Sequence, residues 1–92
     1  MMTKDIKKLL KNHERLIHSE HQKVVSHVQR EQDDWFINTI MIEDISTAFK
    51  YKRKKLYKSL AGHRVNMTYY MEQESIAGMS FDVMNVVRIK VA

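Results

Sequence analysis

The chain has 92 residues, of which 43% are hydrophobic and 29% are charged, and its formal net charge is +5. This length allows one hydrophobic core and therefore one domain, residues 1–92, because two cores would each bury too little surface to offset the entropy of ordering. The composition excludes a disordered chain of low hydrophobicity. The absence of cysteine from the sequence excludes disulfides, thiolate metal sites and cysteine nucleophiles, and it suits the reducing cytoplasm.

Positive charge is concentrated in the middle of the chain. Residues 35–60 hold six Lys and Arg against two Asp and Glu, whereas residues 1–34 hold seven against six and residues 61–92 hold three against three. This excess favours anionic partners such as nucleic acid or acidic protein surfaces. No stretch is apolar for long enough to act as a signal peptide or to cross a bilayer, so we expect a cytoplasmic protein outside the membrane.

Residues 4–30 are predicted to form one long helix. No glycine or proline interrupts this segment, and its apolar residues recur at helical spacing. Thr3 can cap the first turn, where Asp5 is favoured by the helix dipole. The apolar face that we expect to contact a partner consists of Ile6, Leu9, Leu10, Leu16, Ile17 and Val24.

The length of this predicted helix favours a homodimer. A helix of about 26 residues is roughly 40 Å long, whereas a compact unit of about 60 residues is roughly 27 Å across. One end of the helix would therefore overhang, and a second copy could bury its apolar face. In the alternative arrangement the helix bends between Ser19 and Gln22 and folds back on its own β unit.

Residues 35–92 are predicted to form an antiparallel β unit, because β-branched and aromatic residues alternate there with polar ones. We predict strands over 35–45, 47–52 and 63–71, and one or two more within 76–91. Gly62 and Gly78 are expected at turns or bends. The predicted fold class is α+β: a long N-terminal helix followed by a four- or five-stranded antiparallel sheet curled into a small, partly open barrel.

Cations and aromatic rings are interleaved between Phe49 and Lys58. Lysine and arginine can neutralise phosphates, while tyrosine rings can stack on unpaired bases, so this segment is a candidate site for RNA or single-stranded nucleic acid. The candidate binding residues are Lys50, Lys52, Arg53, Lys54, Lys55, Lys58, Arg64, Tyr51, Tyr57 and Tyr70. The alternative interpretation is a solvated edge strand, whose lysines prevent aggregation while its aromatic residues fill the core.

Catalysis and metal binding have little support in the sequence. Glu43 and Asp44 are adjacent, and on a strand adjacent residues point to opposite faces, so they make a poor acid–base pair. His18 and His21 are three residues apart but lack the spacing of a zinc-binding helix motif. We therefore predict that the protein is not an enzyme and needs no metal or cofactor.

Four segments together resemble a group of small uncharacterised proteobacterial proteins. These segments are Phe49 to Lys55, Gly62 with Val65 to Tyr70, residues 76–79 and residues 86–90, and the resemblance covers roughly the last 55 residues. It implies a bacterial source, and it carries no activity and no binding residue over to this chain.

Two functions therefore compete. The first is a small nucleic-acid-binding protein that acts through the basic segment. The second is a protein-interaction or assembly module that acts through the amphipathic N-terminal helix. Binding to a polyanion should weaken steeply as salt is added, whereas an apolar helix contact should survive high salt.

Overall fold

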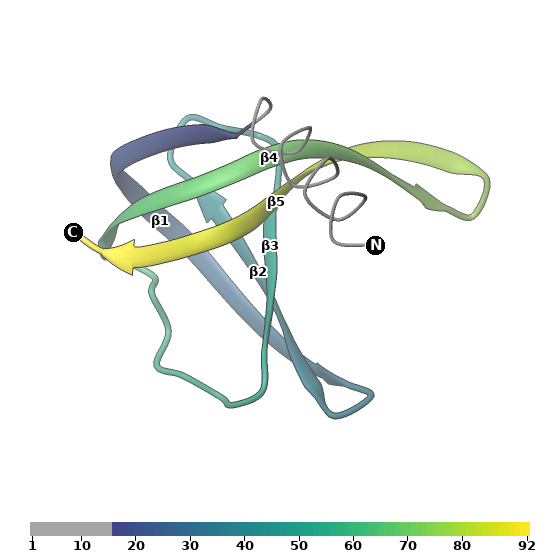
Figure 1. Cartoon of the computed structure of the whole chain (residues 1–92), viewed down its shortest axis with the longest axis horizontal. Helices are drawn as coiled ribbons and strands as arrows, with labels where there is room; N and C mark the ends of the chain where they lie inside the picture. Colours follow the sequence, from purple (N-terminus) through teal and green to yellow (C-terminus); the bar gives the residue numbers. More distant parts are fainter. Residues whose placement is uncertain (1–15) are drawn as a thin grey trace, which may run out of the picture.

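The computed structural model describes residues 16–92, which form five strands and no helix (Figure 1). The strands are β1 (Ile17–Gln32), β2 (Trp35–Ile42), β3 (Phe49–Arg53), β4 (Arg64–Ile76) and β5 (Met79–Val91). Accordingly, the described residues contain no helix that is long and apolar enough to cross a membrane.

The strands form one coiled sheet in the order β1-β2-β3-β5-β4, and β4 pairs in turn with β1, so the hydrogen-bonded order closes. β1 makes this closure possible because its first half pairs with β4 and its second half with β2. The seam between β3 and β5 is much shorter, with only the pairs Phe49–Met84 and Lys50–Asn85. The result is a five-stranded sheet with long projecting hairpins (Figure 1), not an even ring.

The predicted helix over residues 4–30 is wrong from Ile17 onward, where β1 takes its place; residues 4–15 lie outside the described part of the chain. β1 contains two bulges, one between Ser19 and Gln22 and one between Val24 and Ser26. Each bulge adds one residue and reverses which side chains face inward, so a strand's apolar residues can fall at spacings of three or four. The two bulges therefore gave the sequence of β1 an apolar spacing that resembles that of a helix.

The remainder of the predicted fold class also needs correction. The sheet is not purely antiparallel, because β3 and β5 run parallel where they pair. The strands predicted after residue 34 do correspond to β2, β3, β4 and a single β5, although β4 runs on to Ile76. Gly78 lies with Ala77 in the two-residue turn between β4 and β5, where both residues have positive φ.

The hydrophobic core lies inside the coiled sheet. Its buried side chains are Val24, Ile40, Ile42, Phe49, Tyr51, Val65, Met67 and Tyr69. The rings of Phe49 and Tyr69 meet edge to face with centroids 4.8 Å apart, a favoured aromatic geometry. Asn38 is the polar exception, since it lies on the inner face of β2 with 1% of its surface exposed.

The hairpin of β4 and β5 projects beyond the other strands (Figure 1). We call residues 71–84 the arm. The arm contains Glu72, Glu74 and Asp82 and no Lys or Arg, so it carries a charge of −3 on a chain whose net charge is positive.

Candidate nucleic-acid interface

β3 contributes side chains to two different hollows of the molecule. Because successive residues of a strand point to opposite faces, Lys50 and Lys52 line one hollow, which we call the groove. Arg53 lines the other hollow on the opposite side of β3, and the Tyr51 ring lies beneath it. Tyr51 borders both hollows. The basic segment that looked continuous in the sequence is therefore divided between two sites.

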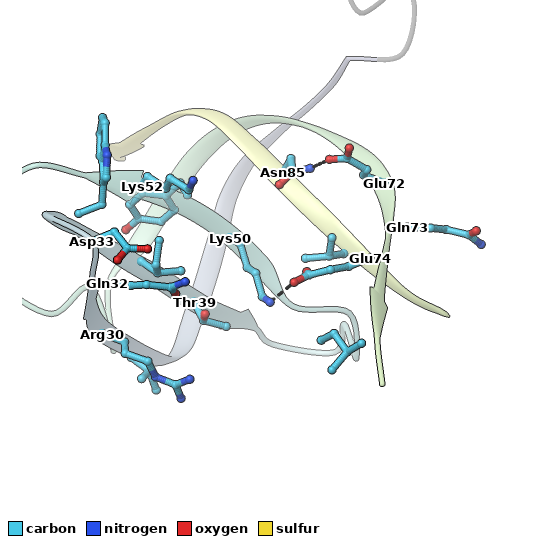
Figure 2. A pocket seen from close by; sticks show the side chains of 16 residues that line it. Arg30, Gln32, Asp33, Thr39, Lys50, Lys52, Glu72, Gln73, Glu74 and Asn85 are labelled. Carbon is cyan, nitrogen blue, oxygen red and sulfur yellow. Dashed lines mark hydrogen bonds and ion pairs between the residues drawn. The ribbon is translucent and has the colours of Figure 1, made fainter. Parts of the chain in front are cut away.

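The groove lies between the outer face of β1, β2 and β3 and the projecting arm, and it has a volume of about 760 Å³. Figure 2 shows Arg30, Lys50 and Lys52 on the sheet side, and Glu72 and Glu74 on the arm. Lys50 Nζ lies 3.1 Å from Glu74 Oε2, and the side-chain amide of Asn85 donates to the carboxylate of Glu72 (Figure 2).

The charged side chains of the groove balance one another. Its three cations, Arg30, Lys50 and Lys52, are matched by three carboxylates, Asp33, Glu72 and Glu74. Lys50–Glu74 is also the one ion pair within residues 16–92. A phosphate entering the groove would displace or face carboxylates, so the groove is poorly suited to a polyanion.

The second hollow, unlike the groove, carries an excess of positive charge. It lies where β3 and β5 diverge after their two paired residues, has a volume of about 340 Å³ and is covered on one side by the loop between β3 and β4. We call it the cationic hollow; it is lined by His27, Asn38, Tyr51, Arg53, Tyr57, Lys58, Leu60, Ile89, Lys90 and Val91. These residues include three cations and no carboxylate.

A chain of hydrogen bonds forms one wall of the cationic hollow. The backbone N–H of Leu60 donates to His27 Nδ1 at 2.8 Å. Because Nδ1 accepts, the donor of the ring is Nε2, which lies 2.8 Å from Asn38 Oδ1 and donates to it. The amide nitrogen of Asn38 donates to the carbonyl of Phe36 at 3.1 Å. This chain joins the loop to the floor of the sheet.

Gln29 fastens the same loop at a second point. Its side-chain nitrogen donates to the carbonyl of Tyr57 at 2.6 Å, and its side-chain oxygen accepts from the N–H of Tyr57 at 3.2 Å. The loop residues Tyr57 and Lys58 are thereby held at the hollow although they belong to no strand.

Tyr51 and Arg53 form a stacked pair in the hollow. The Arg53 guanidinium carbon lies 4.7 Å from the centroid of the Tyr51 ring, at cation–π distance. Burial raises the pKa of Tyr51 above its ordinary value, and the positive charge of Arg53 partly opposes that rise. The hydroxyl of Tyr51 is therefore neutral over the physiological pH range.

The structure brings together four of the ten predicted binding residues, namely Tyr51, Arg53, Tyr57 and Lys58. Two more, Lys50 and Lys52, lie in the groove. The other four line neither hollow: Lys54, Lys55, Arg64 and Tyr70. Among these, Lys54 lies over the Trp35 ring and Arg64 donates to the carbonyl of His21.

The described residues of the predicted partner face do not form one exposed surface. Ile6, Leu9 and Leu10 lie outside the described residues, and Leu16 is half-buried. Ile17 is exposed on β1, whereas Val24 is fully buried in the core and is unavailable to a partner. Homodimerisation stays a prediction.

The two histidines considered as metal ligands, His18 and His21, lie on strand β1 and not on a helix. His18 Nδ1 is hydrogen-bonded to the hydroxyl of Thr68 at 2.8 Å, and His21 lies at the first bulge of β1. Within residues 16–92 no three His, Asp or Glu side chains gather as a metal site would require.

Three residues at these sites were missed by sequence reasoning. Lys90 and His27 reach the cationic hollow from β5 and β1, which only the strand order brings beside β3. Trp35 was assigned to a strand, but nothing in the sequence indicated that its ring would be 37% exposed beside a lysine.

Comparisons with known proteins add no identification: no family model, no curated protein and no solved structure matches the chain. The resemblance of the last residues to small proteobacterial proteins therefore stays a hypothesis.

Proposed function

We propose that this protein binds single-stranded nucleic acid, DNA or RNA, at the cationic hollow. The observation that carries the proposal is the set of lining residues: Arg53, Lys58 and Lys90 without any carboxylate, beside the rings of Tyr51 and Tyr57. This set supplies both kinds of contact that an unpaired strand offers, namely charge for phosphates and ring faces for bases.

The charge of the hollow favours phosphate over other anions of the same size. Three cations from β3, the loop and β5 converge on a space of about 340 Å³, and no described carboxylate lines that space to neutralise them. Each phosphate that they contact releases counterions from the nucleic acid, which gives affinity that falls with salt. A single carboxylate ligand would engage only part of this charge.

The tyrosines favour a single strand over a duplex. Tyr57 is exposed on the loop, where an unpaired base can reach its ring. Tyr51 is largely buried below Arg53 and forms part of the floor instead. Bases of a duplex are stacked on one another and cannot offer a face to Tyr57, so the ring contact requires an unpaired base.

The strand order gives further support by analogy. An order of β1-β2-β3-β5-β4 with a parallel β3–β5 pair is also the order of the oligonucleotide/oligosaccharide-binding class of small sheets, which bind their ligands around the second and third strands. This is an analogy of connectivity alone, and it agrees with a role for β3. Nucleic acid as the ligand also agrees with the cytoplasmic location expected from the sequence.

The experiment is a titration of fluorescein-labelled ten-nucleotide (dT)₁₀, (rU)₁₀ and a ten-base-pair duplex, followed by anisotropy at 50 and 200 mM NaCl. We expect both single strands to bind more tightly than the duplex and to lose affinity at the higher salt. The variant Lys58→Gln/Lys90→Gln should bind (dT)₁₀ at least tenfold more weakly than wild type.

The matched control is Lys23→Gln/Arg88→Gln, which removes the same charge from residues that line neither hollow. Its affinity should fall by less than about threefold, as expected for distant, screened charges. Equal losses in the two double variants, or no binding of single strands by wild type at 50 mM NaCl, would refute the proposal.

A further inference from the structure

The arm is a two-stranded ribbon that no other described strand supports. Beyond Tyr69 of β4 and before Met84 of β5, these two strands pair only with each other. An isolated ribbon of this kind is marginally stable in water, and both of its edges offer unpaired backbone groups. Neither lysine nor proline protects those edges, because the arm has no Lys and the chain has no Pro.

One face of the arm is apolar at its tip, residues 76–81. Directly paired residues of a ribbon place their side chains on the same face. Phe81 pairs with Glu74 and Met79 with Ile76, so Met79 and Phe81 share the face of two residues that line the groove. Ile76, Met79 and Phe81 are 51%, 61% and 47% exposed. Because the arm projects beyond the other strands (Figure 1), its tip leaves this apolar face uncovered.

The arm and the remaining described residues have opposite charge. The arm carries −3, whereas residues 16–70 and 85–92 together hold eleven Lys and Arg against six Asp and Glu, an excess of five positive charges. Two arms therefore repel each other, while the arm of one copy is attracted to the body of another. Charge complementarity thus favours a second copy of this chain as the partner that covers the tip.

The wall of the groove opposite the arm offers a matching surface. Val28 of β1 and Trp35 of β2 lie on this wall and remain 51% and 37% exposed, so the arm of the same chain does not cover them. Arg30 and Lys52 lie on the same wall and form no ion pair with another described residue. The wall is therefore apolar and positive where the tip is apolar and the arm is negative.

We propose that the protein forms a two-fold symmetric dimer, in which the arm tip of each copy packs on the groove wall of the other. Met79 and Phe81 of one copy lie against Val28 and Trp35 of its partner. A two-fold axis uses both tips and both walls, so the assembly closes at two chains. The inference is independent of the proposed function, because the cationic hollow lies on the opposite side of β3.

Sedimentation equilibrium of the full chain between about 5 and 200 μM would measure the assembly. Wild type should approach twice the mass of one chain, and Met79→Lys/Phe81→Lys should raise the dissociation constant of the dimer at least tenfold. The matched control is Val25→Lys/Val87→Lys, which changes two exposed apolar residues that line neither hollow and should raise it less than about threefold. A monomeric wild type, a dimer that persists in the arm variant, or equal losses in the two variants would overturn the proposal. Circular dichroism would check that both variants fold.

Disulfide formation identifies the contact itself. The chain has no cysteine, so in the single variants Met79→Cys and Val28→Cys any disulfide must join two chains. In an equimolar mixture in glutathione buffer, mixed disulfides between the two variants should greatly exceed the half expected from random pairing. Disulfides mainly between two Met79→Cys chains would mean that the arms pair with each other, which would contradict the proposed packing on the groove wall.

Discussion

The groove and the cationic hollow share β3 but differ in what surrounds it. On the groove side the acidic arm returns over the strand and balances its lysines, with Lys50 and Glu74 in contact. On the other side β3 and β5 separate, and Lys58 and Lys90 add to the charge of Arg53. The proposed function therefore assigns the polyanion to the side of β3 on which the fold keeps carboxylates away from the cations.

The largest effect that distinguishes the two sides concerns stability. Asn38→Leu should destabilise the protein by about 2–4 kcal/mol, because it leaves His27 Nε2–H and the carbonyl of Phe36 without partners. Thr39→Val, one residue along β2 on the groove side, should change the free energy of unfolding by less than about 0.5 kcal/mol. Urea unfolding measures both, and equal effects would mean that the hydrogen-bond chain is unimportant.

A smaller effect is expected where the loop is fastened. Gln29→Ala removes both hydrogen bonds to the backbone of Tyr57 and should cost about 1 kcal/mol. Amide hydrogen exchange in residues 54–63 should become faster. The control is Gln73→Ala on the groove side, after which exchange in this loop should stay as in wild type. Unchanged exchange in Gln29→Ala would show that the loop is held by other contacts.

The charge balance of the groove can be broken directly. In Glu72→Gln/Glu74→Gln the groove keeps its three cations and loses two of its three carboxylates. Affinity for (dT)₁₀ should rise about two- to fivefold, the scale of surface-charge effects up to about 1 kcal/mol. Glu43→Gln/Asp44→Asn raises the net charge equally, away from both hollows. The same gain in this control would mean that net charge, not its location, governs binding.

The effect that is smallest at neutral pH comes from Tyr51. Its folded-state pKa is raised by burial, so the folded protein keeps the hydroxyl proton at pH values where the unfolded chain has lost it. That contribution to stability is complete below about pH 10, the ordinary tyrosine pKa, and is lost as the pH rises through the raised value. Urea unfolding between pH 8 and 11 should show this decline, and Tyr51→Phe should reduce it. Tyr57→Phe, at an exposed ring, should leave the decline unchanged.

The sequence predicted β2 to β5 because their alternation is regular. In β4, for example, Val65, Met67 and Tyr69 face the core as their spacing indicated. β1 could not be predicted in the same way, because its two bulges break the alternation and leave Val25 and Val28 exposed at a helix-like spacing from Val24. The alternation of apolar and polar residues does not predict a strand in which bulges reverse the side chains that face inward.

The site was predictable only in part for a different reason. The basic segment itself identified Arg53 and Lys58, but local sequence does not reveal that Glu74, 24 residues further on, pairs with Lys50. Nor does it reveal that Lys90 comes beside the segment through the divergence of β3 and β5. Both facts depend on strand order, which is a property of the whole fold.

The most direct test of the central claim is the salt dependence of (dT)₁₀ binding in two variants that remove equal charge from the two sides of β3. For single strands, each phosphate contact contributes about 0.7 to the slope of log affinity against log salt. Lys58→Gln/Lys90→Gln should therefore lower the slope by about 1.4, whereas Lys50→Gln/Lys52→Gln should leave it nearly unchanged. A larger loss of slope in the groove variant would contradict the account and would place the phosphates on the other face of β3.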